Sequence, residues 1–105
     1  MTDSTRIIPQ FDPVIHEPMR LRICGMLSAV DELQFAALRD ALQLGDAACS
    51  KHLKALVDCG YVSVDKRESD TSRHMVRWYA MTPAGRAAFD GHIAELKRIA
   101  AGIVK

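Results

Sequence analysis

The side chains best suited to binding a ligand are basic and polar residues in two neighbouring stretches of the chain. Ser50, Lys51 and Lys54 form the first stretch, at a spacing that fits one side of a helix. Lysine ammonium groups bind phosphates and guanine acceptors, and a serine hydroxyl donates and accepts hydrogen bonds. The second stretch, over residues 66–77, carries Lys66, Arg67, Arg73, His74 and Arg77. This chemistry suits contact with a nucleic acid.

Two short helices must position the first stretch. Residues 36–42 have helical spacing of leucines, and a second helical segment follows over residues 46–59. Between them, Gly45 is expected to adopt a positive φ and Asp46 to cap the second helix. Two helices joined by such a turn are a helix-turn-helix unit, whose second helix enters the major groove of DNA.

The second helix has an apolar stripe and a small or polar face. Leu53, Leu56 and Val57 are expected to hold it to the core. The residues expected to face DNA are Ala47, Ala48, Ser50, Lys51 and Lys54. Two lysines on any helix are more often a solvated surface, but the preceding turn and the basic stretch that follows favour DNA contact.

The second stretch is predicted to be the loop of a β-hairpin. Apolar residues alternate with polar ones over residues 61–65 and again over residues 74–81, which predicts two strands. The hairpin would form a wing over residues 66–74, lying on the DNA backbone or in the minor groove, where arginine is favoured. Arg73 is the contact we expect at the tip, whereas Glu68 and Asp70 would oppose insertion between phosphates.

The remaining elements are helices whose starts are marked by proline. Asp12-Pro13, Glu17-Pro18 and Thr82-Pro83 each pair a capping residue with proline at the first helical position. The last helix, at about residues 83–103, carries an apolar stripe longer than a small core needs, so we expect it to dimerise. Residues 33–35 are a possible short strand. The predicted fold class is mainly α with a small β-hairpin wing (α+β), a winged helix-turn-helix.

Length and composition fit one small globular domain. The 105 residues are 49% apolar and 26% charged, with a net charge of +1. Residues 12–105 would be the domain and residues 1–11 a flexible arm. The sequence contains neither an apolar run of membrane-spanning length nor a secretory signal, so we expect a cytoplasmic protein with no membrane partner.

Three segments resemble the winged-helix transcriptional regulators of the MarR and ArsR type. They are residues 12–23 (DPVIHEPMRLRI), residues 50–62 (SKHLKALVDCGYV) and residues 78–86 (WYAMTPAGR). The resemblance implies a homodimer that binds double-stranded DNA through Ser50, Lys51, Lys54 and Arg73, with repression as the expected mode. One departure is that small residues, Ala47 and Ala48, stand where many relatives have polar ones, so apolar contact with thymine methyls would replace some hydrogen bonds.

Other functions have weaker support in the sequence. The near-neutral charge leaves open a winged-helix module that binds a protein, and an exposed Cys49 would permit a redox-sensing variant of the regulator. Asp90, His92 and Glu95 are similar to ligands of a metal-sensing relative, but they give too few donors for zinc. No nucleophile and base stand at a recognisable spacing, so we expect no enzyme, cofactor or metal.

Overall fold

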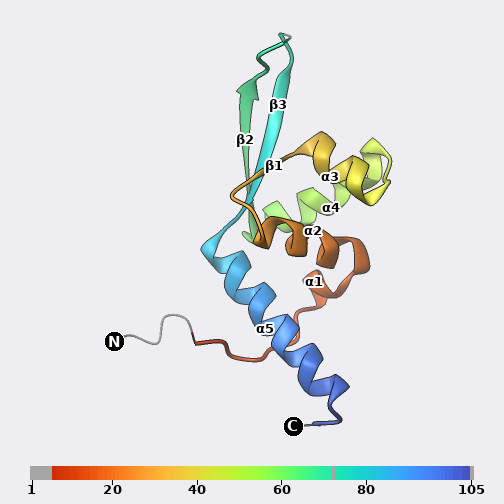
Figure 1. Ribbon diagram of the computed structural model, residues 1–105, viewed down its shortest axis with the longest axis vertical. Coiled ribbons are helices and arrows are strands. Elements are labelled where there is room, and N and C mark those ends of the chain that lie inside the picture. Colours follow the sequence, from red (N-terminus) through yellow and green to blue (C-terminus); the bar gives the residue numbers. More distant parts are fainter. Residues whose placement is uncertain (1–5, 72, 105) are drawn as a thin grey trace.

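The computed structural model describes residues 6–71 and 73–104 as a helical body from which a hairpin and a long helix project in opposite directions (Figure 1). Residues 1–5 of the expected arm, Ser72 in the hairpin and Lys105 lie outside the described residues. The elements are α1 (Pro13–His16), α2 (Pro18–Ser28), β1 (Leu33–Gln34), α3 (Phe35–Leu42), α4 (Asp46–Asp58), β2 (Val62–Glu68), β3 (Met75–Met81) and α5 (Pro83–Ala100). The predicted winged helix-turn-helix fold is confirmed.

The three predicted helix starts are also confirmed. The Asp12 side chain accepts hydrogen bonds from two backbone amides of α1, and Glu17 does the same at α2. The Thr82 hydroxyl accepts from the amide of Gly85 at the start of α5. In each case proline occupies the first turn, where its missing N–H costs no hydrogen bond. Local side-chain chemistry therefore fixes where α1, α2 and α5 begin.

The turn between α3 and α4 differs from the expectation. Gln43, not Gly45, adopts the left-handed conformation, with φ of 55°, and its amide closes the end of α3. Gly45 has φ of −75° and is itself the N-cap of α4, while Asp46 is the first helical residue and makes no capping bond. Gln43 follows α3 directly. The left-handed residue that reverses the chain therefore lies two positions before Gly45, where it was predicted.

The sheet has the strand order β1-β3-β2, with both pairs antiparallel. β2 extends three residues further than predicted, because Lys66 and Arg67 pair with Arg77 and Val76 in the ladder and are not loop residues, whereas β3 begins one residue later than predicted. Val62 is buried, but Val64 on the same strand is 40% exposed. The hairpin therefore leaves the core after its first pairs and projects as a free-standing wing.

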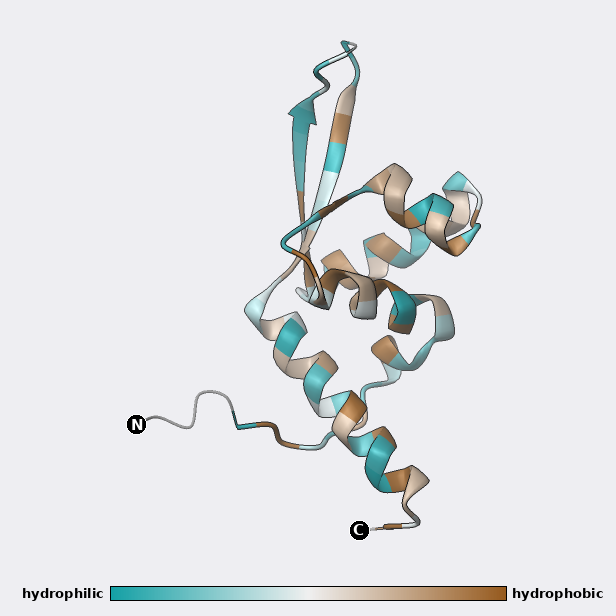
Figure 2. Cartoon of the chain, in the orientation of Figure 1, coloured by the Kyte–Doolittle hydropathy of each residue, from teal (hydrophilic) through white to brown (hydrophobic). Residues whose placement is uncertain are grey.

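The core lies where α1 to α4 meet the base of the hairpin. Its most deeply buried side chains are Ile15, Ile23, Leu27, Leu38, Leu53 and Leu56, each at most 1% exposed. Leu53 and Leu56 hold α4 as predicted, and Figure 2 shows brown, apolar residues recurring along the helices that surround this core. No helix among the described residues has the length and apolar character needed to cross a lipid bilayer.

The junction between the wing and α5 depends on close backbone packing at Gly85. Thr82 donates its backbone N–H to the carbonyl oxygen of Tyr61 and its hydroxyl to the carbonyl oxygen of Gly60. A Cβ atom on Gly85 would collide with that same Tyr61 carbonyl group. Backbone atoms of the strand entry cannot rotate away as a side chain can, so only glycine fits here.

We therefore predict that Gly85→Ala lowers the free energy of unfolding by about 1–3 kcal/mol, the usual cost of overpacking. Urea denaturation followed by circular dichroism measures this change. Gly25→Ala in α2 is the matched control, because its Cβ would meet nothing closer than Phe89 Cζ at 4.0 Å. Both substitutions gain the helix propensity of alanine, so equal stabilities for the two variants would contradict the packing argument.

Candidate nucleic-acid interface

The face of α4 that points away from the core carries four of the five helix residues predicted to contact DNA. Ala47, Ala48, Lys51 and Lys54 are exposed, and Ser50 is half-buried. Ala47, Lys51 and Lys54 recur at spacings of four and three, which places them in line along one side of the helix. The face presents small side chains at the first turn and two ammonium groups beyond it.

The opposite side of α4 fixes this orientation. Cys49, Leu53 and Leu56 are at most 1% exposed and lie in the core cluster. His52, beside them, lies 3.7 Å from the Glu17 carboxylate and 3.4 Å from the Arg20 guanidinium. The helix is therefore held both by apolar packing and by polar contacts with the start of α2, and it cannot rotate about its axis without losing them.

Lys54 is paired within its own helix. Its ammonium group lies 2.7 Å from the carboxylate of Asp58, one turn further along α4, and both side chains are largely exposed. An exposed pair of this kind is weak, about 0.3–0.5 kcal/mol. A phosphate can therefore replace Asp58 as the partner of Lys54 at little cost.

Arg67 is engaged more strongly than the sequence suggested. Its guanidinium donates two hydrogen bonds of 2.8 Å to the Glu32 carboxylate and one of 2.8 Å to Asp65, and it lies over the ring of Trp78. The hydrogen bond from Arg67 lowers the pKa of Glu32. Arg67 thus braces the wing against the turn before β1, and a DNA phosphate would have to compete with two carboxylates for it.

The other wing cations differ in their surroundings. Lys66 and Arg73 are exposed, Lys66 on β2 and Arg73 in the connection between the wing strands. Arg77 is half-buried on β3, with its guanidinium 4.4 Å from the centroid of the Phe35 ring at the start of α3. Stacking on Phe35 limits how far Arg77 can extend from the surface.

Arg39 is a further cation that was not predicted, and it lies in the last turn of α3 beside the start of α4. Its guanidinium is 2.9 Å from both the Asp40 and the Asp46 carboxylates. In a helix-turn-helix, the first helix crosses the DNA backbone, so a cation at this corner is placed to meet a phosphate. No sequence signal reveals this, because the approach of Arg39 to Asp46 depends on the tight turn between the helices.

Two alternatives raised by the sequence are corrected by the structure. Cys49 is not exposed near DNA: its side chain is fully buried, and burial raises the pKa of its thiol. His92 is also fully buried and is hydrogen-bonded to Asp12 and His16, so it does not project with Asp90 and Glu95. No group of three metal-ligating side chains occurs among residues 6–71 and 73–104.

Comparison with known proteins places this geometry in a family. Residues 19–100 match the family described as the winged helix DNA-binding domain. This chain belongs to that family. It is 28% identical over 90 residues to the uncharacterized protein MJ0432 of Methanocaldococcus jannaschii, a match that covers 86% of this chain and 96% of the relative.

Solved structures share the fold. A transcriptional regulator homologue from Pyrococcus horikoshii OT3 superposes with a TM-score of 0.79 and 18% identity, covering 98% of this chain and 95% of that one. A mutant of MarR from E. coli, complexed with operator DNA, gives a TM-score of 0.63 at 14% identity and covers 79% of this chain and 56% of that one. These likenesses show that the chain shares its winged-helix fold with both proteins.

The burial of the cysteines predicts which thiol reacts. Cys59 is exposed at the end of α4, whereas Cys24 and Cys49 are fully buried, and burial raises the pKa of Cys24 to about 12. In the folded protein at pH 8, iodoacetamide should alkylate Cys59 alone, with Cys24 and Cys49 reacting only in denaturant, because the thiolate is the nucleophile. Peptide mass spectrometry measures this, with Cys59→Ser as the control. Rapid alkylation of native Cys49 would contradict the burial.

Proposed function

We propose that this protein is a dimeric regulator that binds specific sites in double-stranded DNA, with α4 in the major groove and the wing on the backbone or in the minor groove. The observation that carries the proposal is the exposed face of α4, where Ala47, Lys51 and Lys54 line one side of a helix held rigidly from behind. A regulator bound across a promoter excludes polymerase, so we propose repression as its mode.

Small residues at the first turn suit direct contact with bases. The alanine methyl groups of Ala47 and Ala48 allow the helix backbone to approach the floor of the groove and to contact thymine methyls. Lys51 and Lys54 follow at the distance of one and two turns, where they can reach phosphates or guanine acceptors. Specificity would then come from the first turn of α4 and most of the affinity from the lysines.

Carboxylates stand beside several of the proposed DNA-contacting cations. Asp58 pairs with Lys54, Asp46 with Arg39, and Glu32 and Asp65 with Arg67. These pairs reduce the positive potential of the free protein and hence its non-specific affinity for DNA. A surface with little positive potential also fits the second candidate function, a winged-helix module that binds a protein partner instead of DNA.

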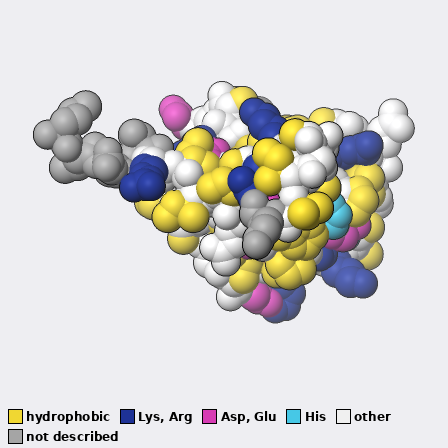
Figure 3. Space-filling view, turned by 90° about the horizontal axis from the view of Figure 1, so that it is seen from below, with side chains coloured by type: hydrophobic (Ala, Val, Ile, Leu, Met, Phe, Trp, Pro, Cys, Tyr) yellow, Lys and Arg dark blue, Asp and Glu magenta, His cyan; other side chains and the backbone are white. Residues whose placement is uncertain are grey.

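Apolar side chains at the foot of the molecule support the dimer. Figure 3 views this end and shows hydrophobic side chains clustered on it. The exposed apolar residues of α5 and its continuation are Ile99, Ile103 and Val104, and those of the N-terminal segment, residues 6–11, are Ile7, Ile8 and Phe11. Exposed apolar side chains gathered at one end of a molecule favour association with a second copy. A two-fold dimer would separate its recognition helices by about 34–36 Å, one turn of DNA.

The DNA proposal is tested by fluorescence anisotropy on the upstream DNA of the coding region and on a scrambled duplex, across a salt series. We expect tighter binding to the upstream duplex and weakening as salt rises, because bound cations release counterions from DNA. Lys51→Ala and Lys54→Ala should each weaken binding by on the order of tenfold or less, and each lost phosphate contact lowers the salt slope by about 1.

Lys97→Ala, an exposed lysine on α5, is the matched control and should leave DNA affinity unchanged. Equal, weak binding of both duplexes, followed by failure of a random-sequence selection, would reject specific DNA recognition and favour the protein-binding alternative. In a transcription assay on the bound promoter, a repressor lowers transcript yield, and a rise in yield would reject repression.

The dimer is tested by sedimentation equilibrium. Ile99→Asp should shift the protein toward the monomer by at least tenfold in dissociation constant, because a carboxylate would be buried without a partner in the interface. Val30→Asp changes a residue of similar exposure, 43% against 52%, in the turn after α2 and should leave association unchanged. A monomeric wild-type protein, or equal effects of the two substitutions, would reject α5 as the interface.

A further inference from the structure

We propose that His92, His16 and the backbone of Asp12 form a proton-controlled latch that holds the N-terminal segment on α5 at neutral pH and releases it in acid. His92 lies on α5 and is fully buried, while His16 is an exposed residue at the end of α1. Phe11 packs on both rings, with centroid distances of 4.7 Å to His16 and 4.9 Å to His92.

The hydrogen bonds fix the protonation state of both rings. The backbone N–H of Asp12 donates to Nδ1 of His92 at 2.9 Å, so this nitrogen carries no proton. The proton of the neutral His92 ring is therefore on Nε2, and it is donated to Nδ1 of His16 at 3.2 Å. Both bonds require neutral imidazoles, and together they connect the N-terminal segment, α1 and α5.

A proton on His92 would break this arrangement. Its Nδ1 would become a donor facing the N–H of Asp12, and two donors cannot hydrogen-bond. Burial, followed by the proximity of His16, lowers the pKa of His92, while the Asp12 carboxylate acts in the opposite direction. Among the described residues, His16 and Asp12 are the titratable groups whose charges act on the ring, and the hydroxyl of Tyr61 donates to Asp12 at 2.5 Å.

The direction of the pH effect follows from the lowered pKa. The unfolded or released chain binds a proton near pH 6.5, whereas the docked state resists it until a lower pH. The docked state is therefore fully favoured above about pH 6.5 and loses this advantage as the pH falls through the docked-state pKa. Acidification, and not alkalinisation, opens the latch.

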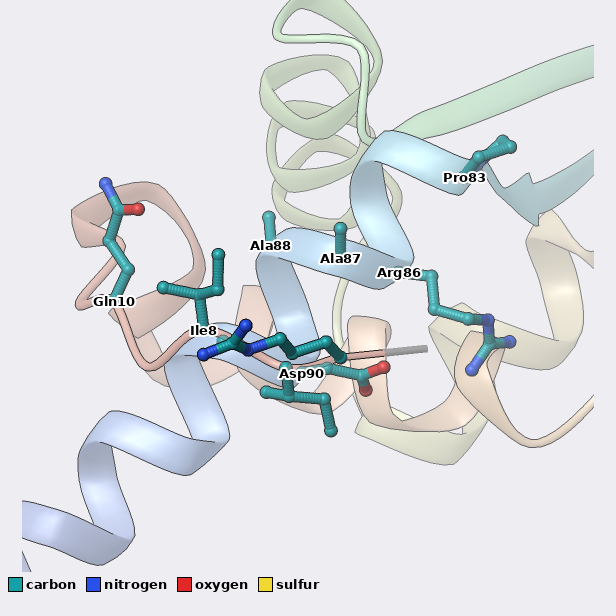
Figure 4. A pocket seen from close by; sticks show the side chains of 10 residues that line it. Ile8, Gln10, Pro83, Arg86, Ala87, Ala88 and Asp90 are labelled. Atoms are coloured by element: carbon teal, nitrogen blue, oxygen red, sulfur yellow. The ribbon is translucent and has the colours of Figure 1, made fainter. Parts of the chain in front are cut away.

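Release would expose a surface that the segment now covers. Gln10 donates its backbone N–H to the carbonyl oxygen of Gly91 at 2.9 Å, and the segment and α5 line a hollow of about 560 Å³. Figure 4 shows Ile8 and Gln10 of the segment near Ala87, Ala88 and Asp90 of α5. Because Ile7, Ile8 and Phe11 belong to the surface that we propose for the dimer, acid release would also weaken the dimer; this consequence rests on the proposed function.

The latch itself is tested without DNA, by hydrogen exchange of the wild-type protein monitored by NMR from pH 8 to pH 5. After correction for intrinsic exchange, protection of the Gln10 and Asp12 amides should fall at least tenfold in acid, while core amides of α4 remain protected. His92→Asn keeps an acceptor near the position of Nδ1 but cannot be protonated in this range. This variant should retain protection of the Asp12 amide at pH 5.

Gly91→Ala should displace the N-terminal segment without changing His92. It therefore tests the latch even if the His92→Asn variant does not fold. The added Cβ would approach the Ile8 carbonyl oxygen to 2.7 Å, so the segment should lose protection even at pH 8. Gly25→Ala, which has room for its Cβ, should behave as the wild type. His74→Gln, an exposed histidine in the connection between the wing strands, is the titration control and should leave the transition unchanged.

Constant protection of the Asp12 amide from pH 8 to pH 5 in the wild type would overturn the latch, as would the same acid loss in a folded His92→Asn variant. Loss of protection without any DNA binding at either pH would support the latch and reject the proposed function. If the protein binds DNA at pH 8 and the protection of its Asp12 amide is the same at pH 5 as at pH 8, the proposed function is supported and the latch is rejected.

Discussion

The burial of one side of α4 determines what the rest of the molecule can present to a ligand. Leu53 and Leu56 are enclosed by the core, and burying such a side chain contributes about 1.5–3 kcal/mol. A rotation of α4 that changed its exposed face would lose both contributions. The positions of Ala47, Lys51 and Lys54 are therefore set by apolar packing on the far side of the helix, which lets the exposed residues vary without cost to the fold.

The wing depends on a different kind of constraint. Beyond Val62 the β2 strand is exposed along its whole length, so apolar burial cannot orient it. Its ladder with β3 holds the strand, and the bidentate contact between Arg67 and Glu32 adds a link to the turn before β1. An ion pair is weaker and more salt-sensitive than a packed core, so the wing is held less firmly than α4, and it is the part of the proposed interface that we expect to adjust to DNA.

The fold could be predicted almost completely, because its signals are local. Asp12, Glu17 and Thr82 mark helix starts through bonds to amides only two or three residues away. The role of Arg67 could not be predicted, because it depends on Glu32, a residue 35 positions away along the chain. Cys49 was misjudged although its position is periodic: it lies four and seven residues before Leu53 and Leu56, on the stripe that is buried.

Tyr61 connects these parts of the molecule. Its backbone N–H donates to Leu56 of α4 at 3.0 Å, and its carbonyl oxygen accepts from Thr82 where α5 begins. Its hydroxyl donates to Asp12, a bond that raises the pKa of the phenol to about 12, so the group remains a donor across the pH range in which His92 titrates. The end of α4, the start of α5 and the N-cap of α1 are thus all hydrogen-bonded to Tyr61. Under the proposed latch, release of the N-terminal segment would change the surroundings of Asp12, and Tyr61 is the residue through which such a change would reach α4.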